Sequence, residues 1–324
     1  MTTLIAGNKR TLYVGTQSAK GTPQTTPTKA FRVSDFTPNP VRAEITLAET
    51  DAGTQQPADV VVGFQPGFSF KCYLRPSNAA WLFASLLGTN ADTGSTPNYT
   101  HTQSAALATP YLTIFEREPS TWCNRYDDCR VTQIQLDGQA GGAIEATVSV
   151  EALTFNAGAT APTTPNAGSD LPYVYPEIVV TRNGSSPGTC SQFTITIARN
   201  GQRAQGDNGF SSLDYVNGLF AISGQLTKYA GDDVDQRQVD TGSTTGTIPT
   251  TTIYSETLAI KATRDTNTSI NIAIAAASYP SRTAAVDTSG APLAEVLGFR
   301  SLPQTTLAAN VVCTVKDQLA TVDT

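Results

Sequence analysis

The chain alternates apolar and polar residues in many short runs, and each such run predicts a β-strand. In GFSFKCYLRP, Phe68, Phe70 and Cys72 share one face of the strand. Ser69 and Lys71 share the other face. A period of two is typical of a strand that is buried on one side only. AIEATVSVEALTF alternates in the same way, and similar runs fill both halves of the chain, which predicts a mainly β protein.

One stretch departs from the alternation and predicts a helix. In SNAAWLFASLLG, Ser77 suits the N-cap, Ala79 to Leu87 favour helix, and Gly88 suits a left-handed stop, which predicts a helix within residues 77–87. The helix is apolar nearly all round, so we expect it to pack against a sheet or a neighbouring subunit. A second, shorter helix is expected at PLAEVLGF, residues 292–299.

Stretches rich in Thr, Gly and Pro divide the chain. Residues 1–30 predict an extended N-terminal arm, and the proline-rich residues 156–173 predict a linker. Two β domains are therefore expected, over residues 31–155 and residues 174–324. Within the first domain, residues 41–60 have apolar ends and a polar middle, which predicts a long hairpin with an exposed tip.

The two halves present similar runs in the same order. GFQPGFSFKCYLRP in the first half is matched by NGLFAISGQLTKYAG in the second, and AIEATVSVEALTF by TLAANVVCTVKDQ. These matches rest on strand pattern, because residue identity is near background. The helix has no evident counterpart, since the acidic, polar DDVDQRQVDTG follows QLTKYAG. The pattern favours a duplicated domain whose second copy has degenerated.

Composition narrows the function. The 324 residues are 15% charged and carry a net charge of −6, which argues against non-specific nucleic-acid binding. His101 is the single histidine, and the sequence has no phosphate-binding loop, dinucleotide fingerprint or zinc-protease motif. No apolar run reaches membrane-spanning length. We therefore expect a protein that is not an enzyme, with no cofactor, no metal ion and no membrane span.

The stretch CNRYDDC is the densest cluster of reactive side chains, and it predicts a loop because it falls between two strand-like runs. Cys123 and Cys129 flank an acidic pair, which leaves three interpretations: a metal site, a disulfide, or a surface loop with two free thiols. Five cysteines in so long a chain suit a reducing cytoplasm, which favours the free thiols. Cys123 and Cys129 should then react with a thiol reagent, while Cys72 and Cys313 stay protected.

The order and texture of these runs resemble a known family. The chain resembles the tail tube proteins of long-tailed, siphovirus-like bacteriophages in four stretches: YVGTQSAKGTPQTTPTKAFRVSDFTPNPVRAEITLAETDAG, VVVGFQPGFSFKCYLRPSNAAWLFASLLGT, YTHTQSAALATPYLTIFERE and CRVTQIQLDGQAGGAIEATVSVEALTF. The match covers about residues 11–155 and continues in layout to the end. It rests on a pattern of strands, one helix and a long hairpin rather than on a single motif.

The resemblance implies two β-sandwich or barrel-type tail-tube domains, the first with a flanking helix and a stacking hairpin. Subunits of this kind close into rings that stack into a tube. The acidic, polar lumen holds the tape measure protein and later conducts double-stranded DNA, which passes without specific binding. The implied partners are further copies of the chain, the tape measure protein, and the tail terminator and distal tail proteins. The implied location is the virion tail, after assembly in the host cytoplasm.

Two sets of candidate residues follow from the resemblance. The inter-ring hairpin set comprises Glu44, Ile45, Leu47, Glu49, Asp51 and Asp59. The lumen set takes the polar faces of the two matched strands and comprises Glu145, Ser149, Glu151, Asn310 and Thr314. For the two glutamates of the lumen set, a solvated outer face is the open alternative.

Two questions stay open on the sequence. Family rings carry six tube domains around the axis, so a duplicated chain predicts a trimer with pseudo-six-fold symmetry, which the paired strand order favours. If the second half is outer decoration, six chains are needed. The alternative function is a two-domain β-sandwich module at a surface that binds a carbohydrate or a receptor. Such a module needs an aromatic stripe, whereas Trp81 lies in the helix and Trp122 in the predicted loop.

Overall fold

The computed structural model describes residues 10–46, 59–118, 122–163, 165, 167–204, 213–231, 233–251, 253–284 and 293–322. As the alternation predicted, this part of the chain is mainly β, and its strands pair antiparallel. The first half contains β1 (Thr11–Thr16), β2 (Lys29–Arg32), β3 (Asp35–Pro38), β4 (Val41–Thr46), β5 (Asp59–Gln65), β6 (Gly67–Tyr73), α1 (Pro76–Leu87), β7 (Ala91–Ser95), β8 (Asn98–Ser104), β9 (Leu112–Glu118), β10 (Trp122–Gln139), β11 (Glu145–Glu151) and β12 (Thr154–Asn156).

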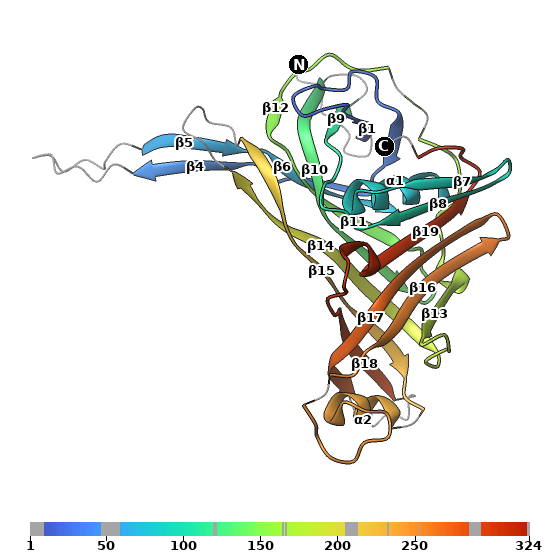
Figure 1. The fold of residues 1–324 in the computed structure, drawn as a ribbon. Coiled ribbons are helices and arrows are strands. Elements are labelled where there is room, and N and C mark those ends of the chain that lie inside the picture. The colour runs from blue at the N-terminus through green and yellow to red at the C-terminus, as the bar shows by residue number, and fades with distance from the viewer. Residues whose placement is uncertain are drawn as a thin grey trace, which may run out of the picture.

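The second half has fewer but longer strands. It contains the 3₁₀ turn η2 (Tyr175–Glu177), β13 (Ile178–Arg182), β14 (Cys190–Ala204), β15 (Asp214–Tyr229), α2 (Val234–Thr241), β16 (Glu256–Asp265), β17 (Thr268–Ala284), β18 (Ala294–Ser301), the 3₁₀ turn η3 (Leu307–Ala309) and β19 (Val311–Asp317). Figure 1 shows β4 and β5 projecting from the body as a hairpin, with α2 at the far end of the long second-half strands.

The two halves pair their strands in the same order. In the first half β6 pairs with β11, β11 with β10, β10 with β9, and β9 with β1. In the second half β15 pairs with β18, β18 with β17, β17 with β16, and β16 with β13. A helix follows the first-named strand in both, α1 after β6 and α2 after β15. From this matching strand order alone, we call residues 10–156 the first repeat and residues 175–317 the second repeat.

Bulges in the central strands fall at matching places. In β10 the pairing with β9 slips after Tyr126, and the pairing with β11 slips before Gln133. In β17 the pairing with β16 slips after Ile274, and the pairing with β18 slips before Ser281. The two slips are equally far apart in both strands. A bulge bends its strand at a defined residue. The equal spacing of the two slips therefore aligns individual residues of β10 with individual residues of β17, whereas strand order aligns only whole strands.

These pairings correct three details expected from the sequence. The counterpart of β11 is β18, not β19, because β18 is the strand that lies between β15 and β17. Residues 292–299 were expected to be helical, but residues 294–301 form β18, where two neighbouring strands supply hydrogen bonds that override a modest helix propensity. The acidic stretch after β15 contains α2, a counterpart of α1 that the polar sequence concealed.

The predicted arm is in part a packed strand. β1 lies between β2 and β9, and its Leu12 and Val14 are fully buried. The expectation of an unpacked arm is wrong for this segment, because the short apolar run TLYVGT was obscured by the polar stretches around it. The hairpin predicted over residues 41–60 is formed by β4 and β5, and its tip, residues 47–58, lies outside the described residues.

One ladder joins the two repeats into a single sheet. The edge of β10 that faces away from β11 pairs with β14, from Gln133 opposite Ala198 to Gln139 opposite Gln192. Apolar side chains of both repeats form one contiguous core under this sheet. The buried Arg199 of β14 donates to the last carbonyls of α1, from Nε to Leu86 at 2.7 Å and from Nη2 to the next residue at 2.7 Å. The second repeat therefore caps the helix of the first.

The stretch between the repeats lies against the other end of the same helix. The carboxylate of Asp170 accepts hydrogen bonds from the backbone N–H of Ser77 at 3.0 Å and from its hydroxyl at 2.7 Å. A carboxylate at this end satisfies a free N–H group and complements the helix dipole. Tyr173 is fully buried. α1 spans Pro76–Leu87, close to the predicted 77–87, and contacts β8, β10 and β19.

Candidate functional site

One face of the joined sheet is polar across both repeats. Its residues alternate with core residues along β6, β11, β10, β14 and β15, and cross-strand pairing aligns them in rows. None of them is buried. We call this surface the polar face, and it comprises Ser69, Lys71, Gln133, Gln135, Asp137, Glu145, Thr147, Ser149, Glu151, Thr194, Thr196, Ser223 and Gln225.

The acidic groups of the polar face have local partners. Glu145 accepts a hydrogen bond from the Ser34 hydroxyl at 3.0 Å, and Glu151 forms an ion pair with Arg203. Asp137 accepts a hydrogen bond from Thr194 at 2.8 Å. Most other residues of the polar face carry amides or hydroxyls. The predicted lumen set includes three residues of this face, all on β11, and none from β6, β10, β14 or β15, although RVTQIQLDG and SQFTITIARNG show the same alternation.

The remaining lumen candidates lie elsewhere. Thr314 is on β19, opposite Asn271 of β17 and Thr102 of β8. Asn310 ends the turn before β19, and its side-chain oxygen accepts a hydrogen bond from the backbone N–H of Gln304 at 3.0 Å. β19 pairs with the first part of β17, as β12 pairs with the first part of β10. Neither residue therefore belongs to the polar face.

The β4–β5 hairpin exposes apolar side chains. Ile45 is 48% exposed and Val60 is 42% exposed. Glu44 and Asp59 are also exposed, and Asp59 accepts a hydrogen bond from the Thr46 hydroxyl at 2.6 Å. Exposed apolar side chains on a projecting element are typical of a protein–protein contact. Three members of the predicted hairpin set lie outside the described residues: Leu47, Glu49 and Asp51.

The second repeat carries a matching hairpin, which was not predicted from the sequence. The outer parts of β14 and β15 pair beyond the joined sheet, and their pairing slips after Asn200, just as the β4–β5 pairing slips after Ala43. Val216 is 59% exposed and Leu219 is 83% exposed. The polar stretch GQRAQGDNG between two strand-like runs was the available signal.

The CNRYDDC stretch is a buried strand, not a surface loop. It forms the first part of β10, where Cys123 is 4% exposed and Cys129 is fully buried. Asp127 pairs with Arg125 at 2.9 Å, and Asp128, at a left-handed φ of 51°, accepts a hydrogen bond from a backbone N–H at 2.7 Å. The prediction of two reactive thiols is therefore wrong, because the charges that indicated water exposure are paired inside the fold. Burial also raises the pKa of the Cys129 thiol.

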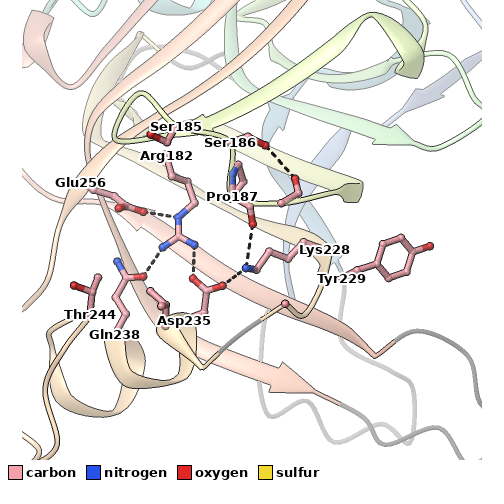
Figure 2. Close-up of a pocket in the computed structure, with 13 residues that line it drawn as sticks. Arg182, Ser185, Ser186, Pro187, Lys228, Tyr229, Asp235, Gln238, Thr244 and Glu256 are labelled. Carbon is pink, nitrogen blue, oxygen red and sulfur yellow. Dashed lines mark hydrogen bonds and ion pairs between the residues drawn. The ribbon is translucent and has the colours of Figure 1, made fainter.

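A pocket beside α2 is lined by charged side chains (Figure 2). The Arg182 guanidinium of β13 contacts Asp235 and Gln238 of α2 and Glu256 of β16. Lys228 of β15 forms a second ion pair with Asp235. Burial works to raise the pKa of Asp235, but hydrogen bonds from the two cations outweigh it and lower that pKa.

This ionic cluster continues behind the pocket. Glu295 of β18 is fully buried and pairs with Lys228 at 3.2 Å and with Arg282 at 2.5 Å. Three cations thus face three carboxylates, which leaves the cluster without net charge. We interpret the cluster as the attachment of α2, which docks through ion pairs where α1 docks through apolar residues.

His101 ties the two repeats together at a second place. It is fully buried on β8, with Nδ1 2.6 Å from Asp92 of β7 and Nε2 3.0 Å from Asp317 of β19. Burial works to lower its pKa, but hydrogen bonds to the two carboxylates raise it to about 9. The ring is therefore an imidazolium at neutral pH, with both N–H groups committed to carboxylates.

The described residues show neither a cluster of metal ligands nor a membrane-spanning helix. Across those residues, His, Cys, Asp and Glu never gather in threes at positions that could hold a metal ion. The two described helices are too short to cross a membrane.

The strand pattern, the helix and the projecting hairpin are the features on which the resemblance to tail tube proteins rests. The model of the family described as "Phage tail tube protein" matches residues 7–300 of the 324. The chain belongs to this phage tail tube protein family. No curated protein matches it. As a tail tube protein it is a structural component of the bacteriophage virion tail, which assembles with other tail proteins, and its mainly β fold agrees with that role.

Proposed function

We propose that three copies of this tail tube protein close into one ring of the tube, so that six repeats surround the axis. The observation that carries the proposal is the duplication: the same strand order, with bulges at matching residues of β10 and β17. If the second half were outer decoration around a six-chain ring, its sheet would lie apart from that of the first half. Instead the β10–β14 ladder makes one sheet with one polar face.

The polar face is proposed to line the lumen, with Glu145, Ser149 and Glu151 among its residues. DNA binds proteins chiefly through phosphates that meet lysine and arginine. The polar face carries one lysine, Lys71, among amides, hydroxyls and acids, so it should let DNA pass. The same surface would house the tape measure protein before ejection. Asn310 and Thr314 are not included in this proposal, because the second-repeat counterpart of β11 is β18.

The two hairpins of each chain are proposed to stack one ring on the next. Their exposed apolar residues would then become buried between rings, which supplies the driving force for polymerisation. Three chains provide six such hairpins. The ends of the tube would contact the tail terminator and distal tail proteins, and assembly would take place in the host cytoplasm. The alternative of a carbohydrate-binding module gains no support from Trp81, which is buried in α1.

Electron microscopy of the purified protein tests the proposal. The expected result is stacked rings or tubes with six lobes around the axis, whose mass corresponds to three chains per ring. Six identical chains per ring, with residues 175–317 on the outside, would overturn the three-chain ring. A protein that stays monomeric at high concentration would overturn the tube-forming role as a whole.

A further inference from the structure

Two strand edges of the joined sheet are open. β3 pairs with β6 on one side, and residues 281–284 of β17 pair with β18 on one side. Within the part of the chain that the structure describes, neither has a strand partner on its other side. Thr37, Pro38, Ser281 and Thr283 are exposed there. An open edge presents unpaired backbone groups and invites pairing with another strand.

The duplication shows what kind of strand fits each edge. β17 is the counterpart of β10. β3 with the start of β4 is the counterpart of β14, since β3 pairs with β6 and β14 with β15, the strands that precede the two helices, and β4 extends the ladder by pairing with β5. Inside the chain, β10 and β14 pair with each other. The open edges of β17 and β3 are therefore the two halves of the same joint, and they lie at opposite ends of the joined sheet of one chain.

We propose that β17 of one chain pairs antiparallel with β3 and the start of β4 of a second copy, in the register of the β10–β14 ladder. This inference rests on the proposed function, and it names the edges that close the ring. Gln133 pairs with Ala198 and Gln135 with Thr196 inside the chain. The counterparts of these pairs place Ser281 opposite Val41 of the neighbour, and Thr283 opposite Asn39 of the neighbour. Each chain carries one edge of each kind, so a head-to-tail ring closes without an unpaired end.

Two prolines leave the β3 side of this joint with fewer hydrogen-bond donors. The backbone N–H of Asn39 donates to Gly67 of β6 at 2.7 Å, so Asn39 faces β6. Because backbone groups alternate in direction along a strand, Pro38 and Pro40 face the open edge. Proline has no N–H to donate, and edge strands are where sheets tolerate it.

The counterparts of the two prolines within the chain are Ile195 and Ile197, which pair with Leu136 and Ile134 of β10. The joint between chains would thus lack two donors that the joint within the chain has. The carbonyls of Pro38 and Pro40 still accept hydrogen bonds from the neighbour. The prolines therefore weaken the joint and keep the free subunit from pairing at random, as proline commonly does on exposed edges.

Disulfide trapping tests the register. Thr283 and Asn39 would form a non-hydrogen-bonded pair, with Cα atoms about 4.5 Å apart, which is within the range of a disulfide. Thr283→Cys with Asn39→Cys, in a Cys190→Ser background, should give a covalent trimer on a non-reducing gel after mild oxidation. The matched control is Thr283→Cys with Asp35→Cys. Asp35 lies four residues before Asn39 on the same strand, so its Cα is about 13 Å from the predicted partner position, and this variant should stay uncrosslinked.

The outcomes separate the inference from the proposed function. Wild-type tubes without a crosslink at the predicted pair would overturn the strand pairing while leaving the tube role intact. Equal crosslinking in the control would overturn the register. Crosslinked hexamers would keep the pairing and overturn the three-chain ring. If the wild-type protein forms neither rings nor tubes, it is the proposed function that fails.

A second variant tests the prolines without breaking the fold. Pro38→Val with Pro40→Val restores two donors, and two hydrogen bonds per joint correspond to about a 30-fold lower concentration threshold for assembly. The control is Pro303→Val, at an exposed proline outside both edges. A threshold that stays unchanged or rises in the double variant would overturn the role assigned to the prolines.

Discussion

His101 offers a quantitative test of the contact between the repeats. Both ring nitrogens face carboxylates, Nδ1 toward Asp92 at 2.6 Å and Nε2 toward Asp317 at 3.0 Å. These contacts raise its pKa to about 9 in the folded protein, against about 6.5 for an unperturbed histidine. The folded state therefore binds this proton more tightly than the unfolded state does. The difference corresponds to about 3 kcal/mol of unfolding free energy.

The sign of the effect fixes its pH window. A group whose pKa is raised on folding contributes its full stabilisation below its unfolded pKa, so the contribution is complete below about pH 6.5. It is lost as the pH rises through 9, where the folded protein also releases the proton. Between pH 7 and pH 10 the wild-type protein should lose about 2 to 3 kcal/mol of stability from this residue alone.

Urea denaturation at pH 7 and pH 10 measures this contribution. The variant His101→Gln keeps a hydrogen-bonding side chain of similar size but cannot titrate. It should be less stable than wild type by about 2 to 3 kcal/mol at pH 7, and nearly equal to it at pH 10. Other groups that titrate in this range cancel in the difference between the two proteins. If that difference is the same at both pH values, His101 is not held as an imidazolium and the reasoning is refuted.

Three further predictions concern other parts of the molecule. Arg199→Met should lower the unfolding free energy by about 1 to 3 kcal/mol in urea denaturation, because the Leu86 carbonyl at the end of α1 loses its donor, while the Leu87 carbonyl keeps the backbone N–H of Ala106; unchanged stability would contradict this. A thiol reagent should label at most the half-buried Cys190 of the native protein, and Cys190→Ser should remain unlabelled until it is denatured; labelling of Cys123 would contradict the buried strand. Deleting residues 48–59 should leave a subunit that has a wild-type circular dichroism spectrum but forms no long tubes in electron micrographs. Long tubes from this variant would refute the role of the hairpin in stacking.

Strands and the first helix were predictable because each follows from a local pattern. The alternation around Phe68 and Phe70 gave the direction of each side chain on β6, and the apolar run after Ser77 gave α1 to within one residue. Both patterns can be read from neighbouring residues, because burial of one face fixes the spacing of apolar residues along the strand or helix.

The CNRYDDC stretch was misjudged because its burial depends on partners far away in the chain. Asp127 is neutralised by Arg125, but it also accepts a hydrogen bond from Asn156 of β12 at 2.9 Å. Asp128 accepts one from Gly21, in the segment before β2. Local composition indicated water exposure, whereas long-range pairing allows these charges to lie inside the fold.

α2 was missed for a related reason. Its buried side chains include Asp235 and Gln238, so the helix shows no apolar stripe to reveal it. α2 is attached through contacts of Asp235 and Gln238 with Arg182 of β13 and of Asp235 with Lys228 of β15. No local sequence pattern predicts these contacts, because the residues are far apart in the chain. The polar face is similar, since each strand shows its own alternation but only the fold shows which strands are neighbours.

For the proposed three-chain ring, the β10–β14 ladder also has a consequence for the entropy and the kinetics of ring formation. In a three-chain ring, three of the six joints between repeats exist before any two molecules meet. Each association of free molecules costs about 4 to 15 kcal/mol of translational and rotational freedom, and a covalent connection removes that cost from half of the joints. Closing the ring then takes two bimolecular encounters instead of five. Assembly should therefore depend less steeply on protein concentration than that of a ring built from six separate single-repeat chains.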